Sequence, residues 1–202
     1  MIIGITGGVG AGKSTVLKYI KEVCCEENID CKIYLLDDEA KKLQNPGMPM
    51  FEAVIKEFGE EILAEDGNVD RTKLASITFG NEENMKRLNN TTLPFILSHI
   101  DKLLSNVKDE DLVFLESAIL LDSSIKDKCN QIWFIQADRN LRKVRLKVNR
   151  DYSEERIKNM FKSQRRDTYF KNRCDIIIYN NDIDVMQNNV KEALGKCLKR
   201  KI

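Results

Sequence analysis

Apolar residues gather in short runs along the chain, at residues 2–6, 31–36, 111–115, 131–135 and 175–179. Each run is continuous and rich in β-branched or aromatic residues, which is typical of parallel strands buried on both faces. Most segments between the runs have helical spacing. Strands that alternate with helices predict a parallel sheet covered by helices on both sides. The pattern therefore predicts an α/β fold with a five-stranded parallel sheet.

Residues 38–110 interrupt this alternation, because they contain no convincing strand. Residues 51–58 have helical spacing, and residues 81–107 predict one long helix or two, with Pro94 as a kink or a boundary. In open α/β sheets, ligands bind at the carboxyl ends of the strands. We interpret residues 38–110 as a helical insertion on that side with a role in substrate binding. The alternative is that these helices have no role in substrate binding.

The first apolar run leads into a phosphate-binding motif. Residues 7–14 read G-G-V-G-A-G-K-S, which matches G-x-x-x-x-G-K-[ST], and a helical pattern follows them. Glycines let the backbone turn tightly and aim its N–H groups inward, and the helix start adds a positive dipole end. We expect Lys13 to reach the outer phosphates of ATP and the Ser14 hydroxyl to hold Mg²⁺. The expected nucleotide-binding residues are Gly8, Val9, Gly10, Ala11, Gly12, Lys13, Ser14 and Thr15.

Carboxylates stand where predicted strands end. Asp37 emerges first after the second apolar run, so we expect it to accept a proton from an acceptor hydroxyl. Asp38 follows it, and capping of the next helix is the alternative for both residues. Glu116 ends the third run and can hold Mg²⁺ through water; its alternatives are a helix cap or a buried salt bridge with Lys13. The single histidine, His99, has the pattern of a surface or packing residue.

Residues 139–173 are rich in arginine and lysine. Such a run is usually a solvated helix face. Phosphoryl transfer, however, needs cations over the migrating charge, and a mobile lid often brings them. Two helices separated by residues 149–153 would form such a lid. We expect Arg150 or Arg145 to be catalytic and most of the other basic residues to lie on the surface.

Composition narrows the class of protein. The chain has 202 residues, of which 42% are hydrophobic, enough for one sizeable core. Its 33 basic and 32 acidic residues give a net charge of +1, which argues against general nucleic-acid binding.

The six cysteines include no C-x-x-C pair, which argues against a zinc site, and we expect them to be reduced thiols. No apolar run is long enough to span a bilayer, and because the first apolar run begins at residue 2 we expect no targeting segment before it. We expect a cytoplasmic protein that acts on small molecules without nucleic acid or membrane, as a monomer or weak homo-oligomer.

Several longer segments resemble the dephospho-coenzyme A kinase family. Residues 58–63 and 66–75 closely resemble its F-G-x-x-[IL]-L and D-G-x-[IL]-[DN]-R-x-x-L-[AG] segments, which are the most specific part of the match. Other matching parts are residues 5–15 at the start, the P-G-x-P turn at 45–49, Phe79, Gln164 and the A-D-x-[IV]-[IL]-x-N ending at 174–180. The resemblance covers nearly the whole chain in the right order.

The resemblance implies a P-loop kinase in which ATP phosphorylates the ribose 3′-hydroxyl of dephospho-coenzyme A. It places Asp37 at the catalytic base, as the residues alone do. It also implies that Asn180 lies by the adenine and that Arg71 and Glu116 face the acceptor. Within a single kinase domain, residues 1–37, 111–138 and 174–202 would form the core, residues 38–110 the acceptor-binding insertion and residues 139–173 the lid.

The chain departs from the family at several positions. Leu35 replaces the first aspartate of the family's D-x-D motif, Leu93 replaces the histidine of its H-P motif, and the proline after Glu116 is lost. Arg145 and Arg150 are five residues apart, whereas the family spaces two lid arginines by four. Two alternatives therefore remain: a kinase for another small-molecule hydroxyl or nucleotide, and a non-catalytic ATP-binding regulator. A GTPase-like switch is disfavoured by the lack of an N-K-x-D motif.

Overall fold

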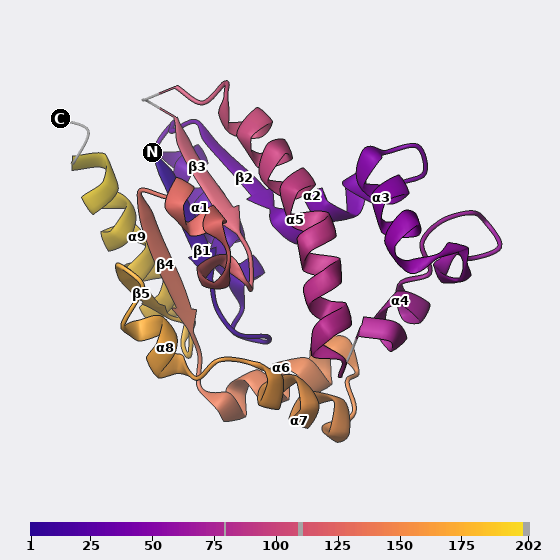
Figure 1. The fold of residues 1–202 in the computed structure, drawn as a ribbon. Coiled ribbons are helices and arrows are strands. Elements are labelled where there is room, and N and C mark those ends of the chain that lie inside the picture. The colour runs from indigo at the N-terminus through magenta and orange to yellow at the C-terminus, as the bar shows by residue number, and fades with distance from the viewer. Residues whose placement is uncertain (79, 109–110, 200–202) are drawn as a thin grey trace. The chain divides into compact units, whose positions relative to one another are not determined.

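The computed structural model describes residues 1–78, 80–108 and 111–199, so Phe79 lies outside the described residues. The strands form one parallel sheet in the order β2-β3-β1-β4-β5 (Figure 1). Their bounds are β1 Ile2–Thr6, β2 Cys31–Leu35, β3 Leu112–Glu116, β4 Gln131–Gln136 and β5 Ile176–Tyr179. This confirms the predicted α/β fold and its five-stranded parallel sheet.

Helices occupy most of the remaining described chain. The α-helices are α1 Lys13–Glu26, α2 Leu36–Leu43, α3 Pro49–Phe58, α4 Arg71–Thr78, α5 Glu82–Leu104, α6 Arg139–Arg150, α7 Glu154–Ser163, α8 Asp167–Lys171 and α9 Ile183–Lys199. Short 3-10 helices are η1 Glu60–Ile62, η2 Leu120–Asp122 and η3 Ser124–Lys128. No described helix combines the length and apolar character that crossing a membrane requires.

Two boundaries refine the prediction. The second strand ends at Leu35, because Leu36 already begins α2 and is buried. Residues 82–104 form one continuous helix despite Pro94 in its interior. Asn81 begins that helix as its N-cap, since its side chain accepts a hydrogen bond from the backbone N–H of Asn84 at 3.0 Å.

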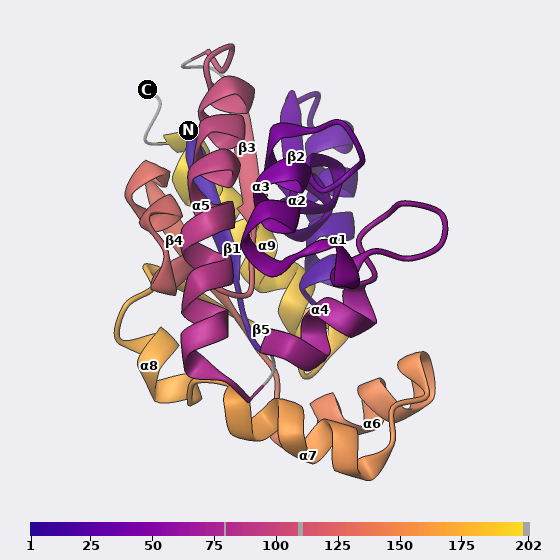
Figure 2. The same cartoon turned by 45° about the vertical axis from the view of Figure 1, so that its right-hand side comes forward.

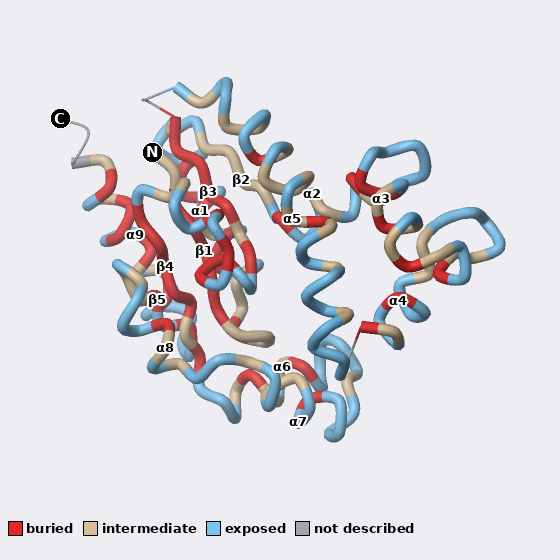
Figure 3. The backbone as a smooth tube through the Cα atoms, in the orientation of Figure 1, coloured by how far each residue is buried: buried red, intermediate tan, exposed pale blue. Residues whose placement is uncertain are grey.

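The sheet is buried on both faces, as the continuous apolar runs predict (Figure 3). On one face, alternate residues of the central strands pack with α1 and α9 in a single core. On the other face, the Phe134 ring of β4 stacks on Phe170 of α8 with centroids 4.9 Å apart. Gly4 of β1 leaves room for η2, because a Cβ there would lie 2.5 Å from the Leu120 side chain.

The chain divides into two compact units. One comprises the described residues of Met1–Leu35 and Lys108–Ile202, which hold the sheet, and the other is Leu36–Val107. The second unit has its own core between α3, α4 and α5, built on residues such as Met50, Val54 and Ile62. Its described residues form no strand, and the backbones of Leu63 and Val69 make only an isolated bridge.

Strand order fixes where the phosphate-binding motif lies. β1 pairs with β3 on one side and β4 on the other, so the loop that follows Thr6 leaves the middle of the sheet at its carboxyl end. This is the place where open α/β sheets bind ligands. The helices α6 and α7 lie side by side at the same end of the sheet (Figures 1 and 2).

Candidate active site

The loop between β1 and α1 has a conformation that its glycines permit. Gly10 has φ +75° and Gly12 has φ +86°, in the left-handed region that residues with a Cβ rarely adopt. The N–H of Ala11 donates to the carbonyl of Gly8 at 3.1 Å, and the N–H of Val16 donates to that of Gly12 at 3.1 Å. Gly12 thus starts α1 without a capping side chain, so the first N–H groups of the helix remain available to an anion.

Lys13 and Glu116 meet beside this loop. The Lys13 ammonium donates to the carbonyl oxygen of Gly7 at 3.0 Å and lies 3.4 Å from Glu116 Oε1. Both side chains are largely buried, with 16% and 13% of their surface exposed. The salt bridge considered from the sequence is therefore present, and it holds a cation and a carboxylate at the phosphate-binding loop. Ser14 and Thr15 lie exposed in the first turn of α1.

Arg145 and Asn180 contact the phosphate-binding loop at Ala11. The Asn180 amide donates to the carbonyl oxygen of Ala11 at 2.8 Å, and Asn180 is buried. The Arg145 guanidinium donates to the Asn180 carbonyl at 2.8 Å and to that of Ala11 at 3.4 Å. Burial lowers the pKa of Arg145. These two residues, taken from separate segments, thus converge on one loop carbonyl.

Arg150 is placed differently. It is the last residue of α6 and is exposed, and no described residue forms an ion pair or hydrogen bond with its guanidinium. Asp151 follows it with φ +50° and ends the helix. The two helices predicted for the lid are α6 and α7, with Ser153 as N-cap of α7 through a 3.2 Å hydrogen bond from the Arg156 N–H.

Arg142 is a contact of the loop that the sequence reasoning missed. Its Nε donates to the Val9 carbonyl at 2.8 Å, and its Nη2 donates to Gln164 Oε1 at 2.7 Å. Gln164 entered the sequence analysis only through the family resemblance. The spacing carried a usable signal, because residues three apart on a helix share a face, and Arg142 lies three residues before Arg145. Basic charge alone did not distinguish these two from their solvated neighbours.

In the second unit, Asp37 lies in the first turn of α2 and is exposed. Asp38 is next to it and forms an ion pair with Lys41 at 2.5 Å. That hydrogen bond holds the pKa of Asp38 below its usual range. Neither aspartate precedes the helix as an N-cap would, because α2 already begins at Leu36.

Arg71 begins α4 beside a polar hollow. The hollow has a volume of about 360 Å³ and is lined by Gln44, Asn45, Asn68, Val69 and Arg71. Asp70 caps the helix by accepting hydrogen bonds from the Thr72 and Lys73 N–H groups at 2.9 and 3.1 Å. The cap leaves the Arg71 guanidinium exposed at the rim of the hollow.

His99 has a packing partner within the same unit. Its Nε2 lies 2.9 Å from Glu39 Oε2, and Lys42 binds the other oxygen of that carboxylate at 2.6 Å. Burial opposes ionisation of Glu39, but the hydrogen bonds from Lys42 and His99 keep its pKa below its usual value. The histidine thus joins α5 to α2, which fits the packing role expected from its sequence pattern.

Comparison with known proteins identifies the family of this chain. A sequence profile of dephospho-CoA kinase matches residues 1–185. The chain belongs to the dephospho-CoA kinase family. A dephospho-CoA kinase from Fusobacterium nucleatum is 32% identical over 185 residues, which cover 90% of each chain. The family resemblance predicted from the motifs is thereby confirmed.

Solved structures agree with this placement. A Thermus thermophilus protein superposes with a TM-score of 0.82 at 23% identity, covering 99% of this chain and 97% of the other. A dephospho-CoA kinase from Campylobacter jejuni superposes with a TM-score of 0.60 at 21% identity, covering 96% of both chains. These similarities establish the fold of a P-loop kinase. Membership of the family makes the protein an ATP-dependent phosphotransferase.

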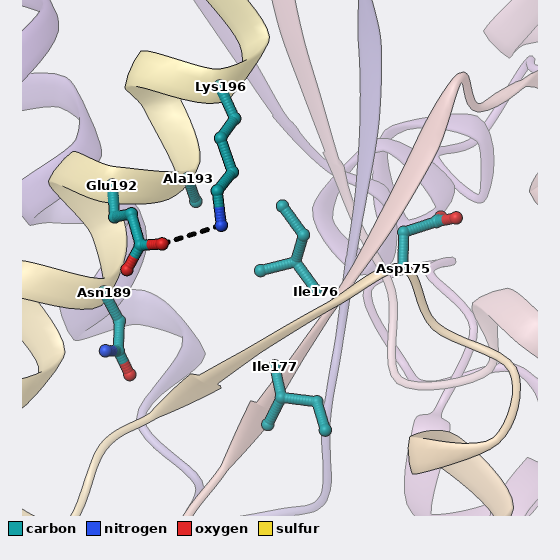
Figure 4. Close-up of a pocket in the computed structure, with 7 residues that line it drawn as sticks. All are labelled: Asp175, Ile176, Ile177, Asn189, Glu192, Ala193 and Lys196. Carbon is teal, nitrogen blue, oxygen red and sulfur yellow. Dashed lines mark ion pairs between the residues drawn. The ribbon is translucent and has the colours of Figure 1, made fainter.

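A second hollow of this kinase, about 240 Å³ in volume, lies between the edge strand β5 and α9 (Figure 4). Glu192 and Lys196 of α9 form an ion pair across one turn at 2.7 Å. Asp175, at its other side, accepts a hydrogen bond from the Ile132 N–H at 2.7 Å and so joins β4 to the start of β5. These polar groups are engaged with one another or with backbone, which indicates a structural role.

Proposed function

We propose that this enzyme transfers the γ-phosphoryl group of ATP to the ribose 3′-hydroxyl of dephospho-coenzyme A, giving coenzyme A and ADP. The observation that carries the proposal is the family match over residues 1–185, joined to an intact phosphate-binding loop with Lys13 beside Glu116. In the reaction, the 3′-oxygen bonds to the γ-phosphorus while the bond from that phosphorus to the β–γ bridging oxygen breaks. The hydroxyl proton passes to a base on the enzyme.

The phosphate-binding loop supplies positioning and electrostatic stabilisation. Its N–H groups and Lys13 would hold the β- and γ-phosphates, because the loop leads directly into the uncapped start of α1. Lys13 donates to the Gly7 carbonyl, and exchange of this weak partner for a phosphate oxygen would leave the fold unchanged. Charge that develops on the leaving oxygen would thus meet donors that are already in place.

Asp37 is the proposed base. It follows Leu35 by two residues, and Leu35 pairs in register with Glu116, whose carboxylate contacts Lys13. Two residues of chain reach at most about 7 Å, which supports a place for Asp37 close to the phosphates. Its exposed carboxylate, unlike that of Asp38, has no lysine held against it among the described residues.

Mg²⁺ is the proposed metal, held by Ser14 and Glu116 together with the phosphates. Both residues offer oxygen, the donor that Mg²⁺ prefers. Within the described chain, no cluster of three or more histidine, cysteine or acidic side chains could hold a metal without help. This suits Mg²⁺, which usually takes one or two protein ligands and completes its shell with water and substrate phosphates. When bound, it would neutralise charge on the phosphate oxygens.

The two lid arginines receive different roles. Arg150 is exposed at the end of α6, so its guanidinium is available to cover the γ-phosphate. Arg145 is engaged with the carbonyls of Ala11 and Asn180, so we assign it and Asn180 to shaping the adenine side of the loop. Arg145 remains part of the nucleotide site, at the loop rather than at the transferred group.

Arg71 is proposed to bind the acceptor. Its guanidinium faces a polar hollow of about 360 Å³ in the second unit, and the side chains around it offer amide donors and acceptors. A guanidinium matches the geometry of a phosphate group. Dephospho-coenzyme A carries a pyrophosphate, so Arg71 would hold the acceptor by charge. We propose a cytoplasmic enzyme that acts on small molecules alone, as a monomer or weak homo-oligomer.

Product analysis tests the proposal. The enzyme is incubated with ATP, Mg²⁺ and dephospho-coenzyme A, and the product is separated and identified by mass and by comparison with authentic coenzyme A. The matched control is an acceptor that lacks the 3′-hydroxyl. The proposal predicts coenzyme A from the first acceptor and no phosphorylated product from the second. Phosphorylation of the 3′-deoxy acceptor, or of a different hydroxyl, would refute it.

A further inference from the structure

Val9 of the phosphate-binding loop is held at both of its backbone groups. Its carbonyl oxygen accepts a hydrogen bond from Arg142 Nε at 2.8 Å, and its N–H donates to Gln164 Oε1 at 3.2 Å. The same Gln164 oxygen accepts from Arg142 Nη2 at 2.7 Å. The three residues therefore form a closed ring of hydrogen bonds that joins the loop to α6 and to the end of α7.

The Arg142 side chain is buried. It is only 8% exposed, and burial lowers its pKa, while the nearby Asp167 carboxylate acts in the opposite direction. Its Nη1 lies 3.6 Å from Asp167 Oδ1, and its guanidinium stacks on the Phe161 ring at 4.9 Å. A buried cation costs free energy unless its donors are satisfied, and these partners satisfy them. A basic residue of a solvated helix face would not be held in this way.

Gly8 shows how closely the guanidinium approaches the loop. A Cβ at Gly8 would lie 2.2 Å from Arg142 Nη2. Gly8 is not among the residues with positive φ, so its backbone conformation is open to other residues. A side chain at this position would therefore have to displace the Arg142 guanidinium from its hydrogen bonds.

We propose that Arg142 and Gln164 are positioning residues that fix the phosphate-binding loop through Val9. They act on the nucleotide through the loop, because their described contacts are with Val9, with each other, and with Asp167 and Phe161. The ring fixes the direction of the Val9 peptide groups before ATP binds, so binding does not have to order them. Since Arg142 belongs to α6, the ring also ties the base of the lid to the loop.

The test measures ATP affinity directly. Isothermal titration with a non-hydrolysable ATP analogue and Mg²⁺ compares wild type with Arg142→Ala and Gln164→Leu. Arg139→Ala is the matched control, because Arg139 is exposed on the same helix and stacks on the same Phe161 ring at 5.0 Å. Loss of positioning should weaken binding by about tenfold to a hundredfold in the first two variants. The control should bind within about twofold of wild type.

A conservative variant and a second readout separate positioning from general damage. Gln164→Glu keeps an oxygen acceptor for both Val9 and Arg142, so it should restore most of the affinity lost in Gln164→Leu. In turnover, both damaging variants should raise KM for ATP and leave KM for the acceptor near its wild-type value. If a variant were only less stable, a smaller fraction of the enzyme would be folded. Its apparent kcat would then fall while both KM values stayed unchanged.

Equal ATP affinity in Arg142→Ala and Arg139→Ala would overturn the proposal, as would equal loss in Gln164→Glu and Gln164→Leu. If Arg142→Ala fails to fold, the Gln164 pair decides, since Gln164 ends α7 and is only half-buried. The turnover readout rests on the proposed function, whereas the titration does not need an acceptor. A wild type inactive on dephospho-coenzyme A would therefore refute the proposed function and leave the affinity test intact.

Discussion

The phosphate-binding loop and the helical unit of residues 36–107 hold their candidate residues in opposite ways. In the loop, Lys13 and Asn180 are largely or fully buried and each has a defined partner. In the helical unit, Asp37 and Arg71 are exposed, and the hydrogen bonds nearby belong to Asp38 and Asp70 instead. Lys13 and Asn180 are thus held in place by the fold, whereas the residues that we propose to serve the acceptor are exposed charged groups.

This difference is consistent with the task that we propose for each set of residues. Donors aimed at phosphates stabilise developing charge most when they need no reorganisation, so rigidity serves them. An acceptor must enter and its product must leave, so exposed groups suit that side. The departures from the family motifs occur in both units: Leu93 lies in the helical unit, whereas Leu35, the lost proline after Glu116 and the changed arginine spacing lie in the unit that holds the sheet. The phosphate-binding loop itself keeps its full motif.

Loss of Lys13 gives the largest expected effect. Lys13→Ala should abolish measurable ADP formation, by about 10³–10⁵-fold, because Lys13 lies at the loop beside Glu116 and is the cation that we propose to hold the outer phosphates. The circular dichroism spectrum should match that of wild type, since alanine suits the first turn of α1, while the melting temperature should fall because Glu116 loses its buried partner. Lys18→Ala, on the exposed face of the same helix, is the control and should keep full activity. Substantial turnover by Lys13→Ala would break the account of the loop.

Asp37→Asn tests the proposed catalytic base. Removal of the proposed base should lower kcat by about 10²–10⁴-fold while ATP affinity stays unchanged. Asp38→Asn is matched in chemistry and position, and it should lose little activity, because its carboxylate is already engaged with Lys41. Rates from acceptor-saturated assays decide between the two. A larger loss in Asp38→Asn would move the base to that residue.

Arg71→Ala should separate binding from chemistry. We expect KM for dephospho-coenzyme A to rise by about tenfold, with KM for ATP unchanged, because one charge-assisted contact to phosphate is worth roughly 1.5–3 kcal/mol. Lys73→Ala is the control on the same helix, where the ammonium binds the Leu63 carbonyl at 2.7 Å. Equal KM values for dephospho-coenzyme A in the two variants would show that Arg71 does not bind the acceptor.

Thiol reactivity gives the smallest and most local test of rigidity around the sheet. Burial raises the pKa of Cys129 and of Cys174 to about 12, whereas Cys25 is exposed on α1. The thiolate is the reactive form, so iodoacetamide at pH 8 should modify Cys25 at least about a hundredfold faster than the half-buried Cys129 and Cys174. Peptide mass spectrometry follows each site. Fast modification of Cys174 in the native protein would contradict the low reactivity expected from its raised pKa and partial burial.

Much of the fold could be predicted from the sequence because its signals are local. The continuous apolar runs place the strands within one residue of their observed ends, and the glycine-rich motif places the loop between β1 and α1. The end of the second strand was extended by one residue, because apolar character alone does not show that Leu36 begins a helix. Pro94 could not be assigned, since a proline inside a helix depends on the packing around it.

Long-range contacts account for what the sequence could not predict. Arg142 reaches Val9 across 133 positions of the chain, and Gln164 reaches it across 155. Within the basic run, nothing in the charge pattern separates this buried arginine from the exposed Arg150. Only the docking of α6 against the loop distinguishes an arginine that shapes the site from one that can cover a phosphate.

The measurement that tests the central claim most directly is ADP release from ATP and Mg²⁺, with and without dephospho-coenzyme A. Wild type is compared with Lys13→Ala and Asp37→Asn. The account predicts strong stimulation by the acceptor, which both substitutions remove, and ATP binding that survives in Asp37→Asn. ATP binding by wild type without acceptor-dependent ADP release would contradict it.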